Sequence, residues 1–264
     1  MVYSRWKARE YKSQIVKRKG KAVVNRQIKR KIKEYSKQRF GKKAYWPYLA
    51  LYTEIRGHFV EGWIPDDFYR YKMLPELSPI NYSNIADIKT FDHHLFREFS
   101  IKPLFVYISG IYYDADMKLI EKSELNKGLT EFDDIIVIKQ EFGKGGKQVY
   151  ILHSADFDFN MLSRSNNYVI QPYIRQFKNL NDLYPDSVNT FRVTTYLDKK
   201  GSVSVKFIIL RFGVDGIKVD NLSSGGQFIY FSSEGEPSEY AYDGDFNCTI
   251  NGNKHKNTGF LYNN

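Results

Sequence analysis

The sequence contains one cysteine, Cys248, among its 264 residues, so a disulfide cannot form within a single chain. No apolar run approaches the roughly 20 residues of a membrane-spanning helix, and the N-terminus lacks the apolar segment of a signal peptide. The GxxxxGK[ST] spacing of a Walker-type phosphate loop is also absent. These absences favour a reducing compartment, make the cytoplasm the simplest location, and exclude a P-loop nucleotide site.

Aromatic residues and unevenly distributed charge are what the sequence has in quantity. The hydrophobic fraction is 42% and the aromatic fraction 16%, which is typical of a globular protein with a sizeable core. Residues 1–43 contain 17 Lys and Arg against two Glu, a net charge of +15. The remaining residues contain 23 Lys and Arg against 28 Asp and Glu, a net charge of −5. This pattern predicts a mildly acidic globule with a basic arm rather than a uniformly basic nucleic-acid-binding domain.

The basic arm has the residue spacing of a helix. Ile28, Ile32 and Tyr35 form a narrow apolar stripe, and Gly20 interrupts an earlier helical segment. One interpretation is a solvated helix that packs one face on the body of the protein. A second is docking on an anionic membrane surface, which would make the protein peripheral at the inner face of a membrane. A third, nucleic-acid binding, is less favoured because no RNA-binding or zinc-finger motif accompanies the arm.

Periodicity and composition divide the chain into three regions. Residues 1–44 are the basic helical arm, and residues 45–100 are a helical region rich in aromatic side chains. From residue 101 to residue 264, period-two strands alternate with short helices, which predicts an α+β fold class.

Residues 87–99 are predicted to form one amphipathic helix. Its apolar face would carry Phe91, Leu95, Phe96 and Phe99. The adjacent His93 and His94 would point about 100° apart on such a helix. Helical metal chelation requires an i, i+4 spacing, so a structural or surface role is expected for both histidines.

A lysine and a glycine-rich turn follow one another in residues 135–150. An apolar strand ends at Lys139, the turn contains Gly143, Gly145 and Gly146, and a second strand comes after it. The backbone N–H groups of a glycine loop approach phosphates closely, and a lysine on the preceding strand reaches them as a point charge. The plainer alternative is a hairpin with a flexible turn and a lysine at its edge.

The strands that follow either end in a polar turn or carry an arginine. Pro172 is predicted to end a strand at Gln171, leaving backbone groups unpaired for the edge of an adenine ring. The sequence SVNTFRVTTY places Arg192 in the next strand, and FIILRF places Arg211 near the end of another. Burying a guanidinium is costly without an anionic partner, which a triphosphate or a substrate carboxylate would supply. An ordinary edge strand and a pair of internal salt bridges are the alternatives.

The series of motifs ends in DNLSSGG, residues 220–226, where Asn221 can both donate and accept hydrogen bonds. The lysine strand, glycine loop, strand break, SVNTFRV, LRFG and DNLSSGG follow one another over about 90 residues. In this order they resemble the sugar-transfer-associated ATP-grasp family, which is related to glutamate ligases. The resemblance covers roughly residues 87–260 and is most specific in its second half. It implies an ATP-grasp fold, in which two α+β subdomains with antiparallel sheets clasp a nucleotide.

The resemblance also implies roles for individual residues. The nucleotide-binding set is Lys139, Gly143, Gly145, Gly146, Gln171, Tyr173 and Asn221. The catalytic set, in contact with phosphate or an acyl phosphate, is Arg192 and Arg211. The implied reaction joins a carboxylate to an amine, with ATP and Mg²⁺ as cofactors, on small or sugar-linked substrates of surface polysaccharide biosynthesis.

One part of the family pattern has no matching counterpart. Family members hold Mg²⁺ with a late Asp and a Glu-x-Asn on their final strands, whereas here only Asp245-Phe246-Asn247 is similar, without a predicted apolar strand before it. His255–Phe260 resembles a segment that precedes those strands, so the final strands are expected to be missing and no metal ligand is assigned. Two functions therefore stay open. One is an ATP-dependent carboxylate–amine ligase, which could be truncated and inactive on its own. The other is a non-catalytic nucleotide- or membrane-binding scaffold of polysaccharide assembly.

Overall fold

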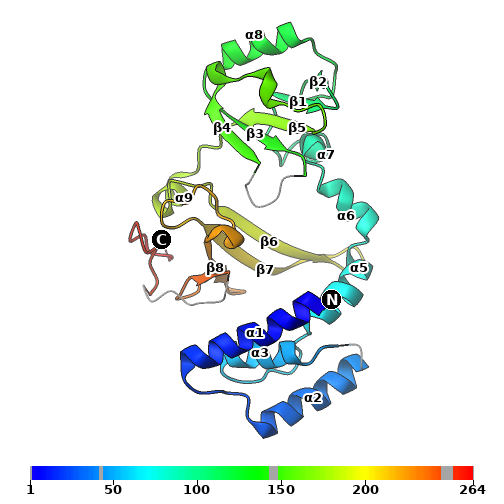
Figure 1. Ribbon diagram of the computed structural model, residues 1–264, viewed down its shortest axis with the longest axis vertical. Coiled ribbons are helices and arrows are strands. Elements are labelled where there is room, and N and C mark those ends of the chain that lie inside the picture. Colours follow the sequence, from blue (N-terminus) through cyan, green and yellow to red (C-terminus); the bar gives the residue numbers. More distant parts are fainter. Residues whose placement is uncertain (1, 42–43, 143–147, 245–251, 264) are drawn as a thin grey trace. The chain divides into compact units, whose positions relative to one another are not determined.

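A computed structural model describes residues 2–41, 44–142, 148–244 and 252–263 (Figure 1). The chain forms two compact units, Met1–Ile85 and Ala86–Asn264. Within the described residues, no helix combines the length and the apolar character needed to cross a membrane.

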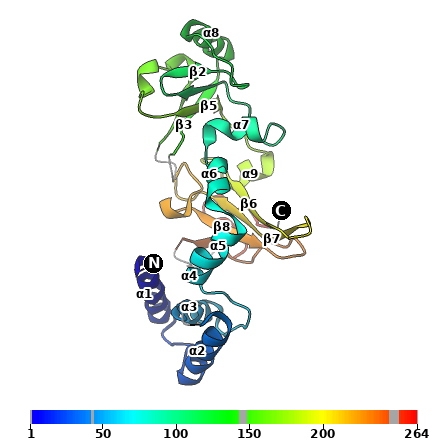
Figure 2. The same cartoon turned by 90° about the vertical axis from the view of Figure 1, so that its right-hand side faces the viewer.

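The first unit is built around α3 (Pro47–Arg56), which packs against α1 (Val2–Lys19) and α2 (Arg26–Phe40) (Figure 2). Nearly every side chain of α3 is buried, because α1 covers one side of it and α2 another. Ile32 from the predicted apolar stripe of α2 is fully buried against α3. The short elements that follow are α4 (Asp66–Phe68), a π-helical turn (Tyr69–Met73), α5 (Leu74–Leu77) and α6 (Ile80–Ala86).

A buried carboxylate fixes the turn between α1 and α2. Glu54 of α3 is fully buried and accepts hydrogen bonds from the backbone N–H groups of Val23 at 2.9 Å and Val24 at 3.2 Å. The ammonium group of Lys12 lies 3.8 Å from the same carboxylate. The Glu54 side chain therefore satisfies backbone donors that the turn leaves without helical partners.

The predicted amphipathic helix over residues 87–99 is wrong. The structure has only a 3-10 turn, Lys89–Phe91, and one short helix, α7 (Asp92–Leu95). Phe99, expected on the buried face, is 89% exposed. The tertiary reason is that Lys89 and Thr90 bond to the end of a strand, and these contacts hold the segment as a 3-10 turn and one short helix instead of one continuous helix.

The second unit contains two antiparallel sheets. The first sheet has the strand order β2-β1-β5-β3-β4. Its strands are β1 (Phe105–Ile108), β2 (Ile111–Tyr113), β3 (Ile135–Gln140), β4 (Val149–His153) and β5 (Tyr168–Pro172). One face of this sheet packs Ile136, Ile138 and Ile170 against Leu125 and Leu129 of α8 (Lys122–Phe132). The opposite face is left for other contacts.

The second sheet has the strand order β6-β7-β8-β9. Its strands are β6 (Thr190–Leu197), β7 (Val203–Phe212), β8 (Gln227–Phe231) and β9 (Tyr242–Asp243). One face carries Leu210, Phe212 and Ile229, which form a core with Leu183 of α9 (Lys178–Leu183) and Tyr262. The mixed architecture with antiparallel sheets is compatible with the predicted ATP-grasp fold.

Gly213, directly after β7, tests how tightly the second core is packed. A Cβ atom at this position would lie 2.5 Å from Tyr184 Cε1 and 2.8 Å from Ser187 Oγ. We expect Gly213→Ala to lower the free energy of unfolding by about 1–3 kcal/mol, because the added methyl group overpacks a closed site. Gly128→Ala is the matched control in α8, where a Cβ meets open space. That control should raise stability by about 0.5–1 kcal/mol through helix propensity, and urea titrations giving equal effects would contradict the packing.

Candidate functional site

Lys139 and Gln171 lie on the face of the first sheet that α8 does not cover. The strand register pairs Lys139 with Val169 and Val137 with Gln171, which puts both polar side chains on one face. They line a cavity of about 430 Å³. The residues that contribute charged or polar groups to its wall are Lys89, Thr90, Asp92, His93, Ser100, Lys139 and Gln171. The structure thus brings together two of the predicted nucleotide-binding residues and adds neighbours that were not predicted.

The cavity is electrostatically unusual, because two lysines share it. Burial lowers the pKa of Lys139, and the nearby charge of Lys89 lowers it further, while Asp92 opposes the shift. Burial raises the pKa of Asp92, and the two lysines oppose that shift. Two ammonium groups in a partly desolvated cavity with one carboxylate favour an anionic ligand such as a phosphate.

Lys89 is held at the end of β3, where the glycine-rich stretch begins. Its Nζ donates to the carbonyl oxygens of Gln140 at 2.9 Å and Glu141 at 2.7 Å. Thr90 donates to the buried Glu141 carboxylate, which also accepts from Asn167 Nδ2 at 2.8 Å. Sequence reasoning missed Lys89 because the helical pattern of residues 87–99 gives no indication that the start of this segment bonds to the end of β3.

The glycine-rich turn itself lies outside the described residues. Gly143, Gly145 and Gly146 are therefore predictions about the sequence only. The strands on either side of that turn, β3 and β4, pair from Lys139–Val149 to Ile135–His153, as the predicted hairpin requires.

The predicted strand break at Pro172 is wrong on one side of β5. The strand includes Pro172, which pairs with Ile136, and the Tyr173 N–H donates to the Ile135 carbonyl at 3.0 Å. On the β1 side, pairing ends earlier, with Leu104 N–H donating to Ile170. The backbone groups of Gln171 and Tyr173 are therefore engaged with β3, whereas pairing with β1 ends at Ile170. Proline tolerates the β3 pairing because that ladder uses the N–H groups of the alternate residues.

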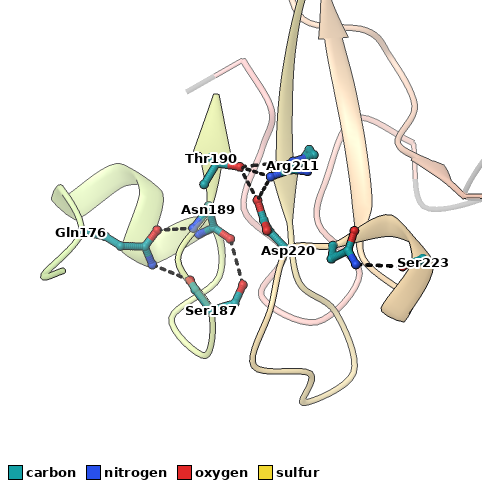
Figure 3. Close-up of polar contacts among 8 residues, drawn as sticks. Gln176, Ser187, Asn189, Thr190, Arg211, Asp220 and Ser223 are labelled. Atoms are coloured by element: carbon teal, nitrogen blue, oxygen red, sulfur yellow. Dashed lines mark hydrogen bonds and ion pairs between the residues drawn. The ribbon is translucent and has the colours of Figure 1, made fainter. Parts of the chain in front are cut away.

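Three of the sequence motifs meet in one polar cluster of the second sheet (Figure 3). Arg211 forms an ion pair with Asp220 at 3.0 Å and donates from two nitrogens to Thr190 Oγ1, at 2.9 and 3.2 Å. Thr190 in turn donates to Asp220. The side chains of Arg211 and Asp220 are only 18% and 14% exposed. The structure therefore contains an internal salt bridge at Arg211, which was the alternative to an anionic ligand as its partner.

Asn189, the asparagine of SVNT, has a structural role beside that cluster (Figure 3). Its side chain is buried and donates to the carbonyls of Leu180 at 2.6 Å and Tyr184 at 2.8 Å. Gln176 accepts from the Asn189 N–H at 2.6 Å and donates to the Ser187 carbonyl at 2.7 Å. These bonds tie the end of α9 to the start of β6 and fix the position of Thr190.

Arg192 lies on the same face of the second sheet as Arg211 but differs from it in exposure and in hydrogen bonding. Thr190 pairs with Arg211 and Arg192 pairs with Ile209, so the two arginines point the same way. Arg192 is exposed and makes no hydrogen bond or ion pair with any residue that the structure describes. The expectation of two costly buried arginines is therefore wrong for Arg192, since solvent hydrates its guanidinium group.

The DNLSSGG turn positions Asp220 through its glycines. Gly225 has φ +99°, and a Cβ atom on Gly226 would lie 2.6 Å from the Asp220 carbonyl oxygen. Both positions therefore favour glycine, one for its backbone angle and one for close packing. Asn221 donates to Ser223 Oγ at 2.8 Å, and its side chain is half-buried beside the turn.

The late carboxylates do not form a metal site that the structure can describe. Asp245 and Asn247 lie outside the described residues, and the described strand that comes before them in the chain is β9 (Tyr242–Asp243). Over the described ranges, no three His, Cys, Asp or Glu side chains gather closely enough to hold a metal ion. Asp220 is already paired with Arg211, so the described residues do not fit a magnesium site.

His255 connects the C-terminal segment to the second core. The ring is 1% exposed, with Nε2 at 3.0 Å from the Gly213 carbonyl and Nδ1 at 3.3 Å from the N–H groups of Asn257 and Thr258. A neutral imidazole satisfies this arrangement, donating from Nε2 and accepting at Nδ1. Burial lowers the pKa of His255, against smaller contributions from the Gly213 carbonyl and Asp215 that raise it.

A family model described as sugar-transfer associated ATP-grasp matches residues 89–264, about two thirds of the chain. The match begins at Lys89, the first residue of the cavity, and includes the Thr190 cluster and His255. No curated protein and no solved structure matches the chain.

The lowered pKa of His255 predicts acid sensitivity in a defined pH range. Between the ordinary histidine value near pH 6.5 and the lower folded-state value, the unfolded chain binds more protons than the folded chain. Stability should therefore be full above about pH 6.5 and fall as the pH decreases below it. Melting temperatures measured from pH 8 to 5.5 should show this loss, and His255→Phe should flatten it while lowering stability throughout. His58→Gln, at an exposed histidine, should keep the wild-type slope; an unchanged slope in the His255 variant would contradict the assignment.

Proposed function

Because the chain belongs to the sugar-transfer associated ATP-grasp family, we propose that it is an ATP-dependent ligase that joins a carboxylate to an amine. The substrates would be small or sugar-linked molecules of surface polysaccharide biosynthesis. The observation that carries the proposal is the cavity in which Lys89 and Lys139 stand together on the uncovered face of the first sheet. ATP would supply an anionic ligand for this pair of lysines.

The two lysines have complementary roles in phosphate binding. Lys139 is partly desolvated, so an anion that reaches it gains an interaction that water screens weakly. Lys89 is anchored to the end of β3 and brings a second positive charge to the start of the glycine-rich stretch. Gly143, Gly145 and Gly146 would cover the phosphates with their backbone N–H groups. Gln171 and Tyr173 would hold the edge of the adenine ring.

The arginines of the second sheet would act on the transferred phosphate. Arg211 is held by Thr190 and Asp220, which fixes the position of its guanidinium group. Arg192 has a solvated guanidinium fork that is suited to a phosphate or a carboxylate. Asn221 beside them would orient the nucleotide or the acyl phosphate.

The reaction proceeds in two balanced steps. A carboxylate oxygen attacks the γ-phosphorus of ATP, the bond to the β-phosphate oxygen breaks, and an acyl phosphate and ADP form. An amine nitrogen then attacks the acyl carbon, the carbon–oxygen bond to phosphate breaks, and an amide, inorganic phosphate and a proton result. The side chains of Arg192 and Arg211 would stabilise the charge on the transferred phosphoryl group in both steps. The family generally uses Mg²⁺, but the described residues do not fit a magnesium site.

One observation favours a second candidate, a non-catalytic nucleotide-binding scaffold. The described residues offer no cluster of metal ligands, and Asp220 is engaged with Arg211. Such a scaffold would bind ATP without forming an acyl phosphate. Residues 1–43, with their net charge of +15, would in that case attach it to an anionic membrane surface.

Replacing the cavity lysines tests the nucleotide site. Lys139→Met and Lys89→Met should each weaken ATP binding about 10–100-fold, because each removes one charge-assisted contact. Lys139→Met should leave thermal stability unchanged or higher, because the lowered pKa of Lys139 marks a charge that the folded chain disfavours. Isothermal titration calorimetry with ATP measures the affinity, and Lys127→Met, at an exposed lysine of α8, is the matched control. Equal affinity in all three variants would refute the site.

Hydroxylamine separates the ligase from the scaffold. An acyl phosphate reacts with hydroxylamine to give a hydroxamate, so a mixture of ATP, glucuronate or glutamate, and hydroxylamine should yield hydroxamate and ADP in equal amounts. Arg192→Gln should reduce the yield at least tenfold with little change in ATP affinity. ATP binding without hydroxamate from either acid would favour the scaffold.

A further inference from the structure

The face of the second sheet that carries Arg192 also has an aromatic surface. In one row across the sheet, the register pairs Thr190 with Arg211, Arg211 with Phe228, and Phe228 with Tyr242. In the next row, Arg192 pairs with Ile209, and Ile209 pairs with Tyr230. The face is opposite to the one that packs Leu210 and Ile229 into the core.

Three rings stand together at one end of these rows, and we call them the aromatic platform: Phe228, Tyr230 and Tyr242. The ring centroids of Phe228 and Tyr242 are 5.7 Å apart and those of Tyr230 and Tyr242 are 5.9 Å apart, each pair inclined by 32°. Tyr230 is 38% exposed. A sheet face that is turned away from the core normally carries polar residues, so adjacent rings there indicate a surface on which another molecule rests.

Between the platform and Arg192 lies a buried apolar residue. Ile209 is 6% exposed and forms the floor between Tyr230 and Arg192, which are two strand spacings apart, about 10 Å. A ligand bound over Ile209 would contact the aromatic platform on one side. On the other side it would contact the guanidinium group of Arg192, which has no partner among the described residues. A ligand that spans the floor therefore needs a ring that can stack and an anionic group at its far end.

We propose that this face binds a sugar ring bearing a carboxylate, with the aromatic platform under the ring and Arg192 on the carboxylate. The proposal rests on the ligase function above and names its carboxylate substrate as a uronic acid. The C–H bonds on one face of a pyranose carry partial positive charge, which the electron-rich faces of tyrosine and phenylalanine attract. The carboxylate matches the planar fork of Arg192, where it would also lie in position for phosphorylation. A cationic ring is disfavoured by the charge of Arg192, and a neutral nucleobase would leave Arg192 without a counter-ion.

Binding of a simple glycoside to the full chain tests the proposal. The probe is methyl β-D-glucuronide, compared with the neutral methyl β-D-glucoside and with glutarate, a carboxylate without a ring. Saturation-transfer NMR should report contact at the ring C–H protons of both sugars. Calorimetry should give an affinity about tenfold higher for the glucuronide than for either control, because only the glucuronide uses the platform and Arg192 together.

Variants assign the two parts of the site. Tyr230→Leu and Tyr242→Leu keep an apolar side chain but remove the ring face, and together they should weaken glucuronide binding about tenfold. Arg192→Gln should instead make the glucuronide and the glucoside bind equally. Tyr196→Leu, at an exposed tyrosine of β6, is the matched control and should bind like the wild type. If the double variant melts at a lower temperature than the wild type, glucuronide affinity is measured in the two single leucine variants instead.

The outcomes separate this proposal from the ligase function. ATP binding together with equal affinities for glucuronide, glucoside and glutarate would overturn the uronic-acid site and leave the nucleotide site intact. Unchanged glucuronide affinity in the leucine variants would also overturn it. Glucuronide binding that depends on the platform, in a chain that does not bind ATP, would support the sugar site and refute the ligase. Stronger saturation transfer to adenosine than to the glucuronide, lost in the leucine variants, would reassign the platform to a nucleobase.

Discussion

The ion pair between Arg211 and Asp220, bridged by Thr190, is the contact on which the second sheet and its site depend. It joins three segments that are distant in sequence: the start of β6, the end of β7 and the turn before β8. Both charged side chains are largely withdrawn from water, so neither is stable there without the other. The same contact fixes one positive charge on the open face of the sheet. Beside it, Arg192 stays solvated and is the guanidinium that a ligand can take.

Residues of similar type therefore have different tasks in this protein. Asn189 is buried, and its side-chain amide donates to backbone carbonyls in and after α9, whereas the side chain of Asn221 lies at a turn and donates to Ser223. In the same way, Lys89 is anchored by backbone carbonyls and Lys139 is partly desolvated in the cavity wall. Such pairs combine one residue that builds the site with one that is placed to meet a ligand. The energetic cost of holding two lysines in one cavity is the physical reason to expect an anion there.

Much of the framework was predictable because it follows local rules. The strands with Lys139, Gln171, Arg192 and Arg211 were predicted from period-two patterns, and the structure contains all of them. Gly20 ends α1 as the sequence indicates, with the positive φ that glycine adopts easily. The prediction of one helix over residues 87–99 was wrong because Lys89 and Thr90 bond to the end of a strand about 50 residues away, a contact that local apolar spacing does not indicate.

The sequence by itself determined the order of the motifs, the fold class and the family resemblance, since these depend on composition and spacing along the chain. Only the tertiary structure decided which polar residues are committed to each other. It paired Arg211 with Asp220, left Arg192 in solvent, continued β5 through Pro172, and placed Phe228, Tyr230 and Tyr242 on one face. The physical reason is that an ion pair or a sheet register is chosen among residues far apart in sequence. Local spacing limits the candidates, but packing and desolvation in the folded chain select the partners.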